Sequence, residues 1–409
     1  MKTNICLIGV NFYPEDTAIG LYSTQLCRFL NDQGDRVSVV TGFPYYPDWK
    51  IKSDYQCRPF LYQEGLQGIH VLRYKQYVPE KPSFKTRILH MLDFTLGSFL
   101  NLFKVKHCDV VICVVPFTST VFLGWMLARF KGARLWVHIQ DFEVDAILES
   151  GIASSEKGIN KLVFQLLFSI ERFLFNRADI VSTISHGMIG KLEHKTRRET
   201  YYFPNWVSGD EINPSVASLH PIFNGHSEQF KILYSGNVGE KQDWDFFVGL
   251  IDYFSGDSRI HFFIVGQGAK FSSLKEGLSP FKNVTVREPV PFSELNDLLC
   301  SADLHVLFQK KEVVDTVMPS KILGMMASSV PSLVTGNLES EVARVLHDSQ
   351  GDGFFEAGKL QESARFIKSL VDSPEKVSSM GGAARRYILG NFSADKVLPA
   401  FRKKLNQLL

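Results

Sequence analysis

The sequence predicts two α/β domains, each a doubly wound parallel sheet, that face each other across a cleft. The chain has 409 residues, more than one hydrophobic core usually organises. Short apolar runs rich in β-branched residues alternate with amphipathic stretches of helical period, a pattern typical of parallel strands joined by crossover helices. The alternation breaks at a polar, loop-like stretch from 208 to 227 and then restarts. We therefore place the first domain over 1–207 and the second over 208–390.

Strand candidates occur in both halves of the chain. In the first half they are Ile5–Val10, Val37–Thr41, Val110–Val115, Leu135–Ile139 and Ile180–Ile184. In the second half they are Lys231–Tyr234, His261–Val265, Val284–Val286, Leu304–Phe308 and Ser332–Val334. Doubly wound sheets bind ligands beyond the carboxyl ends of their strands, so we expect the functional site in the cleft between the domains.

The composition excludes several classes of function. The chain is 45% hydrophobic and 22% charged, as is usual for a globular protein. A formal net charge of +2 argues against a dedicated nucleic-acid binder, which needs a basic excess to neutralise phosphates. The six cysteines form no Cys-x-x-Cys pair, so we expect a reducing, cytoplasmic environment and no zinc site.

Two apolar segments are interpreted as parts of the fold rather than as export or membrane signals. Met1–Val10 has too short an apolar core for a signal peptide and is predicted to be a buried first strand. Val110–Ala128 carries no charge over a length that could span a bilayer. Pro116 divides it into a β-rich half and a half that can begin a helix. A strand, a loop and a helix are therefore favoured over a transmembrane helix.

The most informative turn lies near the middle of the chain. The strand candidate that begins at Lys231 ends in Ser235-Gly236-Asn237, and Lys241 follows. Small residues at such a turn let backbone N–H groups approach an anion, and the lysine adds positive charge. The segment is equally compatible with an ordinary connection whose lysine faces water.

Two further glycine turns follow strand candidates. Gly20 precedes the predicted helix Leu21–Leu30, and Gly266 and Gly268 close the strand that ends at Val265. Each turn could admit a phosphate or a nucleotide, although a simple helix start or close packing also explains these glycines. No Gly-x-Gly-x-x-Gly follows any strand, so binding of a dinucleotide lacks its main sequence support.

The helix predicted over Lys321–Ser328 offers another anion site. Ser320 is a natural N-cap, and the free N–H groups of the first turn carry partial positive charge. An anion placed there would also meet Lys321. A capped surface helix with a solvated lysine is the alternative.

Acidic residues and a histidine raise the question of a metal site. His138, Asp141 and Glu143 follow a strand, but a strand exit does not place them on one helical face, so a polar group at the cleft is favoured over a metal ligand set. The triplet Asp243-Trp-Asp245 resembles a metal-binding Asp-x-Asp motif, yet it lies at a predicted helix start. Helix capping is the better explanation for it.

A basic segment precedes an amphipathic helix in the first half. Five of the residues from Arg73 to Arg87 are basic and one is acidic. Apolar residues then recur at helical spacing from Phe84 to Phe103, at positions 84, 88, 92, 96, 99 and 103, and Lys104 and Lys106 follow. The pattern is equally typical of a helix on an anionic membrane surface and of a core helix with solvated ends.

Together these segments resemble the family 4 glycosyltransferases, which have the GT-B architecture of two Rossmann-like domains. The resemblance covers nearly the whole chain. It is carried by Asn11–Glu15 with Ile19-Gly20, Phe43–Pro47, Val78-Pro79 with Pro82-Ser83, His138–Ala146, Phe203–Trp206, Tyr234–Gln242 and Pro319–Lys321.

The resemblance implies a role for individual residues. The donor diphosphate would meet Gly236, Asn237 and Lys241 in the second domain and Gly20 in the first, while His138 would face the donor sugar. The remaining residues implied at the site are Gly266, Gly268, Ser320 and Lys321 for the donor, and Tyr45, Tyr46 and Asp141 for the acceptor or cleft. The final helix, 391–409, would pack back on the first domain.

The sequence also departs from the family pattern. Many relatives carry two glutamates eight positions apart, where this chain has Thr316 and Gly324, and an arginine is common at the position of Asn237. These departures put the usual carboxylate contacts to the donor in doubt. They leave Lys241, with Lys321, to meet more of the charge on the leaving group.

The resemblance implies a retaining hexosyltransferase on the cytoplasmic face of the inner membrane. It would move a sugar, L-fucose or a related deoxysugar, from a UDP or GDP donor to an undecaprenyl-diphosphate-linked glycan of a surface polysaccharide, without a metal or other cofactor and without nucleic acid. The alternatives are a catalytically weak scaffold in a polysaccharide assembly complex and a two-domain epimerase or phosphorylase.

Overall fold

The computed structural model describes the chain as two compact units. The first comprises Met1–Pro204 with Leu398–Leu409, and the second comprises Asn205–Val397. The residues described are 2–16, 18–81, 83–142, 144–145, 161–311, 320–351 and 353–409.

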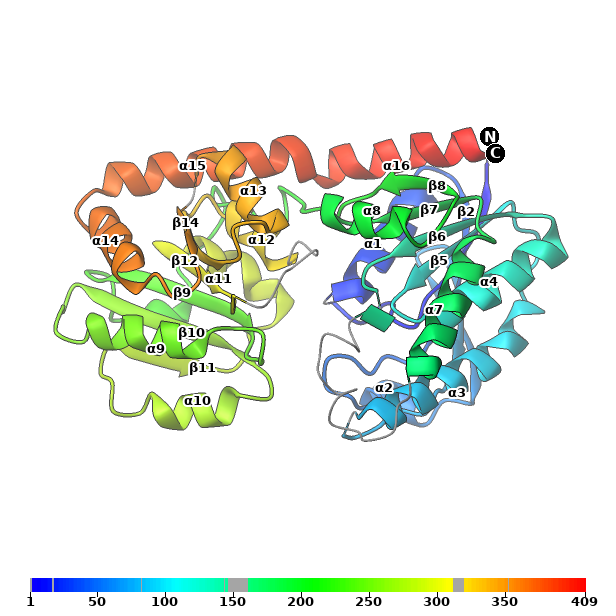
Figure 1. The fold of residues 1–409 in the computed structure, drawn as a ribbon, viewed down its shortest axis with the longest axis horizontal. Helices are drawn as coiled ribbons and strands as arrows, with labels where there is room; N and C mark the ends of the chain where they lie inside the picture. The colour runs from blue at the N-terminus through cyan, green and yellow to red at the C-terminus, as the bar shows by residue number, and fades with distance from the viewer. Residues whose placement is uncertain are drawn as a thin grey trace. The chain divides into compact units, whose positions relative to one another are not determined.

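The first unit is built on an eight-stranded sheet with the order β3-β4-β2-β1-β5-β6-β7-β8. Figure 1 labels β2, β5, β6, β7 and β8 of this sheet. All neighbouring strands are parallel except β3 and β4, which form an antiparallel hairpin. The strands are β1 (Asn4–Ile8), β2 (Arg36–Gly42), β3 (Leu61–Leu66), β4 (Ile69–Tyr74), β5 (Val110–Val115), β6 (Arg134–Ile139), β7 (Ile180–Thr183) and β8 (Glu199–Tyr202).

Helices connect these strands, and the C-terminal helix adds to them. They are α1 (Ala18–Asp32), α2 (Ser53–Gln56), α3 (Phe84–Leu102), α4 (Thr118–Lys131), α7 (Lys161–Phe175), α8 (His186–Glu193) and α16 (Ala394–Leu408). Phe401 of α16 stacks on Phe203 at a ring distance of 4.4 Å and lies 4.6 Å from the ring of Trp136. Arg402 of the same helix pairs with the buried Asp35 at 3.1 Å. The last part of the chain is therefore an integral part of the first unit.

The uncharged segment 110–128 forms a strand and a helix, as the sequence predicts. β5 is buried along its whole length between β1 and β6, and α4 begins after Phe117. Among the described residues, no helix is both long and apolar enough to cross a bilayer.

The second unit has a six-stranded parallel sheet with the order β11-β10-β9-β12-β13-β14. Its strands are β9 (Phe230–Asn237), β10 (Ile260–Gln267), β11 (Val284–Arg287), β12 (Leu304–Phe308), β13 (Ser332–Gly336) and β14 (Gly353–Glu356). Its α-helices are α9 (Trp244–Tyr253), α10 (Phe271–Gly277), α11 (Leu295–Cys300), α12 (Ser320–Ala327), α13 (Glu341–Ser349), α14 (Leu360–Val371) and α15 (Pro374–Phe392). Two short 3₁₀ turns, Pro221–Phe223 and Phe292–Glu294, complete the description.

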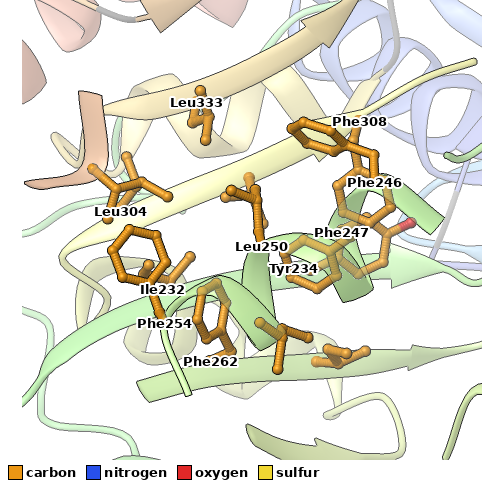
Figure 2. Packing of buried hydrophobic residues seen from close by; sticks show 14 of the residues in the cluster. Ile232, Tyr234, Phe246, Phe247, Leu250, Phe254, Phe262, Leu304, Phe308 and Leu333 are labelled. Carbon is orange, nitrogen blue, oxygen red and sulfur yellow. The ribbon is translucent and has the colours of Figure 1, made fainter. Parts of the chain in front are cut away.

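An aromatic cluster holds β9, β12 and α9 together (Figure 2). Phe247 of α9 stacks on Phe308 of β12 with a ring distance of 4.4 Å, and Tyr234 of β9 lies 5.0 Å from Phe308. The side chain of Asp243 accepts a hydrogen bond of 3.2 Å from the backbone N–H of Phe246, so it caps α9 as predicted. These contacts fix the end of β9, where the predicted phosphate turn lies.

Four strands are absent from the sequence-based prediction. β3 and β4 form a hairpin whose turn contains Gln67 and Gly68, both with positive φ (49° and 90°). β3 is an edge strand with mostly partly exposed or exposed side chains, so it lacks the apolar run that marks a buried strand. β8 and β14 are four-residue edge strands, too short for a clear pattern.

Candidate functional site

The turn at the end of β9 is held by a hydrogen-bonded chain that begins on α12. The amine of Lys321 donates to the hydroxyl of Tyr234 at 3.2 Å, and that hydroxyl donates to the backbone carbonyl of Asn237 at 2.6 Å. Gly236 has a φ of 136°, a conformation that favours glycine. The predicted turn therefore has a fixed backbone conformation, and a lysine from a distant helix supports it.

Lys321 lies directly against this turn. Its amine is 4.6 Å from the centre of the Tyr234 ring, and a Cβ atom placed on Gly236 would lie 3.0 Å from it. Burial lowers the pKa of Lys321 to about 8. In the part of the chain that the structure describes, no carboxylate pairs with this amine. An anion bound at Gly236 would offset this desolvated positive charge.

Ser320 is the first described residue of helix α12 and is exposed. It lies within the helix, whereas the predicted N-cap would precede it. Gly324 lies inside the helix, where an added Cβ would come within 3.3 Å of Leu299. Thr316 and Pro319 fall outside the described residues.

Gly266 and Gly268 lie beside the same turn because β10 pairs with β9. Gly266 is in register with Gly236, and an added Cβ on it would lie 2.0 Å from the carbonyl oxygen of Gly236. An added Cβ on Gly268 would lie 2.4 Å from the carbonyl oxygen of Val238 and 2.5 Å from Oδ1 of Asn237. Close packing of the two strand ends therefore requires both glycines, whatever ligand they meet.

Lys241 extends from the same loop into solvent. Its side chain is exposed, and it forms no ion pair with a described residue. Its backbone carbonyl accepts a hydrogen bond of 3.1 Å from the N–H of Lys310, which fixes the loop at this position. The neighbouring Glu240 is neutralised by Lys270 at 2.8 Å. The second unit thus places two lysines near the turn at Gly236. Lys321 is partly buried and lies against Gly236 in space, whereas Lys241 is exposed and follows Gly236 in the sequence.

In the first unit, Gly20 lies against a buried carboxylate. Gly20 is the third residue of α1, and an added Cβ would approach the carbonyl oxygen of Glu15 to 2.9 Å and its Oε2 to 3.3 Å. Only glycine therefore fits here without a local shift, and the reason lies within the protein itself.

Glu15 anchors the loop that carries the predicted acceptor residues. Its Oε1 accepts hydrogen bonds from the backbone N–H groups of Tyr45 at 2.7 Å and Tyr46 at 2.8 Å, and its Oε2 accepts one from Asn11 at 2.8 Å. Burial raises the pKa of Glu15 above its usual value of 4.5, although these hydrogen bonds act in the opposite direction.

Tyr45 and Tyr46 have different surroundings. Tyr46 is 36% exposed, whereas Tyr45 is buried with its ring 4.8 Å from that of His90 and 5.5 Å from that of Trp49. Burial lowers the pKa of His90, and no described residue partners its Nε2 atom. Tyr46 is therefore the tyrosine of this pair that a ligand can reach directly.

His138 lies inside the sheet rather than at its edge. The side chain is buried, its Nδ1 donates to the hydroxyl of Ser182 at 2.9 Å, and its Nε2 accepts from the amide of Gln140 at 2.9 Å. Burial lowers the pKa of His138 to about 3, so the ring is neutral at physiological pH. Gln140 follows directly after β6 and is the polar group next to His138 at the strand end.

The remaining predicted polar residue is exposed. Asp141 follows Gln140 and lies on the surface, while Glu143 falls outside the described residues. No group of three or more His, Cys, Asp or Glu side chains among the described residues is arranged to hold a metal ion.

Comparison with known proteins gives the family. Residues 17–206 match the family model described as a glycosyl transferase 4-like domain. The chain is 33% identical over 398 residues to the colanic acid biosynthesis glycosyl transferase WcaI of Escherichia coli K12, and the match covers 94% of this chain and 92% of that protein. This chain belongs to the family 4 glycosyltransferases. The prediction of a sugar-transferring enzyme of this family is confirmed.

A more distant relative and solved structures agree with this assignment. The glycosyltransferase is 21% identical to N-acetyl-alpha-D-glucosaminyl L-malate synthase of Bacillus anthracis, over 96% of this chain and 95% of that protein. Sucrose-phosphate synthase from Thermosynechococcus elongatus matches with a TM-score of 0.74 at 13% identity, over 100% of this chain and 99% of that one. Anabaena Alr3699/HepE in complex with UDP-glucose matches with a TM-score of 0.68 at 13% identity, over 99% of each chain. These likenesses confirm the GT-B fold.

Three residues of the glycosyltransferase that sequence reasoning missed are Glu15, His90 and Gln140. Glu15 belongs to the segment that carries the family resemblance, but only the structure shows its contacts with the loop at Tyr45. His90 lies in a helix interpreted from its apolar residues alone. Gln140 stands two positions after His138, which was the predicted site residue. A strand buried on both faces is apolar throughout, so its sequence pattern does not show which of these two polar residues would face a ligand.

Proposed function

We propose that this glycosyltransferase moves a sugar from a UDP or GDP donor onto a lipid-linked oligosaccharide during synthesis of a bacterial surface polysaccharide. The relation to WcaI, whose name assigns it to colanic acid biosynthesis, supports the pathway class. The matching fold of HepE, solved with UDP-glucose, supports the donor class. L-fucose or a related deoxysugar is the proposed sugar, and undecaprenyl diphosphate is the proposed acceptor carrier.

The observation that carries this proposal is the lysine-supported turn at the end of β9. Gly236 offers a backbone without a side chain, the Lys321 amine lies against it without a carboxylate partner among the described residues, and Lys241 is exposed nearby in the chain. A diphosphate bound there would receive backbone N–H groups and positive charge together.

The chemistry follows from the group that leaves. Negative charge builds on the diphosphate as its bond to the sugar breaks, so fixed donors and lysines aimed at it lower the barrier. We assign Lys241 and Lys321 to this role, with Asn237 and Ser320 as further donors. The acceptor hydroxyl attacks on the face that the diphosphate leaves, and a donor phosphate oxygen takes its proton, so the anomeric configuration is retained. No metal ion is required in this scheme.

In the first unit, we propose that Gln140 faces the donor sugar and that His138 positions it. The imidazole is neutral and both of its nitrogens are engaged, so it acts through the amide that it holds. Gly20 is proposed to approach the diphosphate. Tyr46 and Asp141, which are exposed, are proposed to meet the acceptor.

The proposed location is the cytoplasmic face of the inner membrane, because a lipid-linked acceptor is held in a bilayer while nucleotide sugars are soluble. We propose that attachment to the membrane surface lets the enzyme meet both substrates.

Protection against thermal unfolding tests the donor assignment. A ligand that binds the native state raises the melting temperature, and more so the further its concentration exceeds its dissociation constant, so UDP, GDP and their sugar conjugates are screened in parallel at equal concentration. Either UDP and its conjugates or GDP and its conjugates should stabilise the protein. The nucleotide sugar that is the donor should be among the stabilising compounds. A catalytically weak scaffold, suggested by Gly324 in place of a common glutamate, would be stabilised by none of them.

A further inference from the structure

Helix α3 exposes apolar side chains and buries polar ones. The large apolar residues on its exposed side, with that of the following turn, are Leu89 (52% exposed), Leu92 (49%), Leu96 (74%), Leu100 (51%) and Phe103 (69%). Its buried side carries His90, Thr95, Ser98 and Asn101 beside Phe94. This arrangement is the reverse of a surface helix in a soluble protein, whose apolar stripe faces the core. The exposed leucines therefore need a partner outside the fold.

Two neighbouring helices extend this apolar surface. α4 packs against both α3 and α7 (Figure 1). The hydroxyl of Thr95 on α3 bonds to that of Ser119 on α4 at 2.7 Å, and Trp125 on α4 meets Phe173 on α7 at a ring distance of 6.0 Å. The exposed apolar residues that these helices add are Phe122 (40% exposed), Phe130 (66%), Leu166 (60%), Ile170 (44%) and Phe173 (47%).

We call this the three-helix face: the exposed apolar residues of α3, α4 and α7 together with Phe103. Single exposed leucines are common on soluble proteins, but nine large apolar side chains on three adjacent helices, with Phe103 in the turn after α3, are not. Such patches mark a site where a protein or a membrane binds.

Most charges around the three-helix face are positive, although Glu80 beside Lys81 is exposed, and Asp109 and Asp179 near its other basic residues are partly exposed. Asp93 and Glu171 are the acidic residues of the three helices, and both are engaged inside the protein. Asp93 accepts hydrogen bonds from the hydroxyl of Tyr74 and the backbone of Tyr77, and Glu171 is buried against Lys195 at 2.5 Å. The exposed basic residues on these helices or beside their ends are Lys81, Lys85, Arg87, Lys106, Arg129, Lys131, Arg172 and Arg177.

Part of the basic segment noted in the sequence does not contribute. The side chain of Arg73 is buried, where it bonds to Glu64 and to the carbonyl oxygen of Gly42, and Lys75 bonds to the backbone of Gln56. Of the apolar positions read from the helical period, 92, 96 and 103 are exposed, whereas 88 and 99 are partly buried. The sequence predicts an apolar surface on one helix, whereas the structure shows exposed apolar residues on three helices.

We infer that the three-helix face inserts into the interfacial region of an anionic lipid bilayer. Helices that carry apolar residues toward the acyl chains and basic residues at their margins bind such surfaces by burial of apolar area and by attraction to acidic headgroups. A second copy of the chain fits less well, because a symmetric pairing of this face would place its basic margins against each other. The inference rests on the proposed function only for its biological purpose, since it gives the acceptor membrane a docking surface.

Sedimentation with vesicles tests the inference directly. Vesicles of phosphatidylcholine alone, or with one third phosphatidylglycerol, are mixed with wild type and with the double variant Leu96→Glu/Phe130→Glu. Both residues are more than half exposed, so the variant should fold. We expect wild type to prefer the anionic vesicles, and the double variant to lose about tenfold or more of its binding to them, since two large apolar contacts are replaced by repelled charges.

Matched controls separate apolar insertion from other effects. Val216→Glu/Leu338→Glu places the same charges at residues 70% and 62% exposed in the second unit and should bind vesicles as wild type does. Lys106→Glu/Lys131→Glu should weaken binding to anionic vesicles and leave the weak binding to neutral ones unchanged.

Three results would overturn the inference. They are equal vesicle binding by wild type and Leu96→Glu/Phe130→Glu, no vesicle binding by wild type, and a wild-type dimer in light scattering without lipid that the same substitutions dissociate. Protection of each variant by UDP and GDP is measured in parallel. Loss of vesicle binding with retained nucleotide protection supports the inference, and vesicle binding without any nucleotide protection sinks only the proposed donor site.

Discussion

The amine of Lys321 and the hydroxyl of Tyr234, 87 residues apart in the sequence, are joined by a hydrogen bond of 3.2 Å. The same hydroxyl donates to the backbone carbonyl of Asn237, so Lys321 is connected through Tyr234 to the end of β9. The Tyr234 ring is itself fixed against Trp244 and Phe308, with both ring distances at 5.0 Å. The aromatic core of the second unit therefore sets the position of the charge in the proposed diphosphate site.

Removal of that charge should weaken nucleotide binding more than removal of the hydroxyl. Lys321→Met keeps the apolar stem and loses the amine, so the affinity for UDP or GDP should fall roughly thirtyfold, the equivalent of about 2 kcal/mol for a charge-assisted contact. Tyr234→Phe keeps the ring and loses one hydrogen bond, for which about threefold to tenfold is expected. Calorimetry measures both. Equal affinities in wild type and Lys321→Met would place the diphosphate elsewhere.

The pKa of Lys321 predicts how stability and binding change with pH. Burial lowers this pKa from 10.5 to about 8, so between these values the unfolded chain holds a proton that the folded protein has released. The free energy of unfolding of the free enzyme should therefore rise with pH from about 8 to 10.5, relative to Lys321→Met. Denaturant titrations at several pH values measure this difference, and a constant difference would refute it.

Nucleotide binding should reverse part of this shift. A diphosphate beside the amine favours its charged form, so binding of UDP or GDP at pH 8.5 to 9 should take up a proton. Calorimetry in buffers of different ionisation enthalpy counts that proton. Lys321→Met should show a smaller uptake, and the same uptake in both proteins would assign the proton to another group.

Glu15 should control the loop at Tyr45 and Tyr46. Glu15→Ala leaves two buried backbone N–H groups without their acceptor, for which a loss of about 2 to 4 kcal/mol of stability is expected. Glu15→Gln keeps an acceptor oxygen and should be milder. Burial raises the pKa of Glu15, so the stability that this carboxyl confers is lost as the pH rises above about 4.5, and Glu15→Gln should gain on wild type over that range. An unchanged difference between pH 4.5 and 7 would contradict this account.

His138 should not titrate in the physiological range. Burial lowers its pKa to about 3, so its ring resonances should show the neutral form down to pH 5. Because the unfolded chain binds the proton first, the contribution of this residue to stability should be lost as the pH falls below its usual value of 6.5. Gln140→Ala should reduce turnover about tenfold or more if the amide is the group at the donor sugar. A protonated His138 at pH 6 would restore it as a candidate acid.

Much of the framework could be predicted because buried parallel strands are continuous apolar runs. β5 and β12 have the bounds expected from the sequence, because an apolar run of strand length is bounded by Asp109 and Pro116 in one case and by Asp303 and Gln309 in the other. Gly236 was predicted in a turn after Tyr234, but β9 continues through Gly236 to Asn237, so the strand ends three residues later than expected. The edge strands β3 and β8 were missed, because partly solvated strands lack this signal.

The contacts that define the site could not be predicted from local patterns. The neighbours of Lys321 and Glu15 lie 87 and about 30 residues away, and no spacing rule connects them. His138 is the penultimate residue of β6 and Gln140 follows the strand directly, and the apolar pattern of a strand covered on both faces does not show which of the two polar side chains is engaged inside the sheet. The sequence did not show which side of α3 is exposed. Its polar residues face the protein because their hydrogen-bond partners, such as the Tyr77 carbonyl and Ser119, lie outside this helix.

Calorimetric titration of UDP and GDP into wild type and Lys241→Ala tests the central claim, that the turn after β9 binds a nucleoside diphosphate. Lys275→Ala, an exposed lysine on α10, serves as the matched control. One of the two nucleotides should bind to wild type and to the control with equal affinity, and its affinity for Lys241→Ala should be about tenfold to a hundredfold lower. Binding of neither nucleotide to wild type, or equal binding to wild type and Lys241→Ala, would contradict the claim.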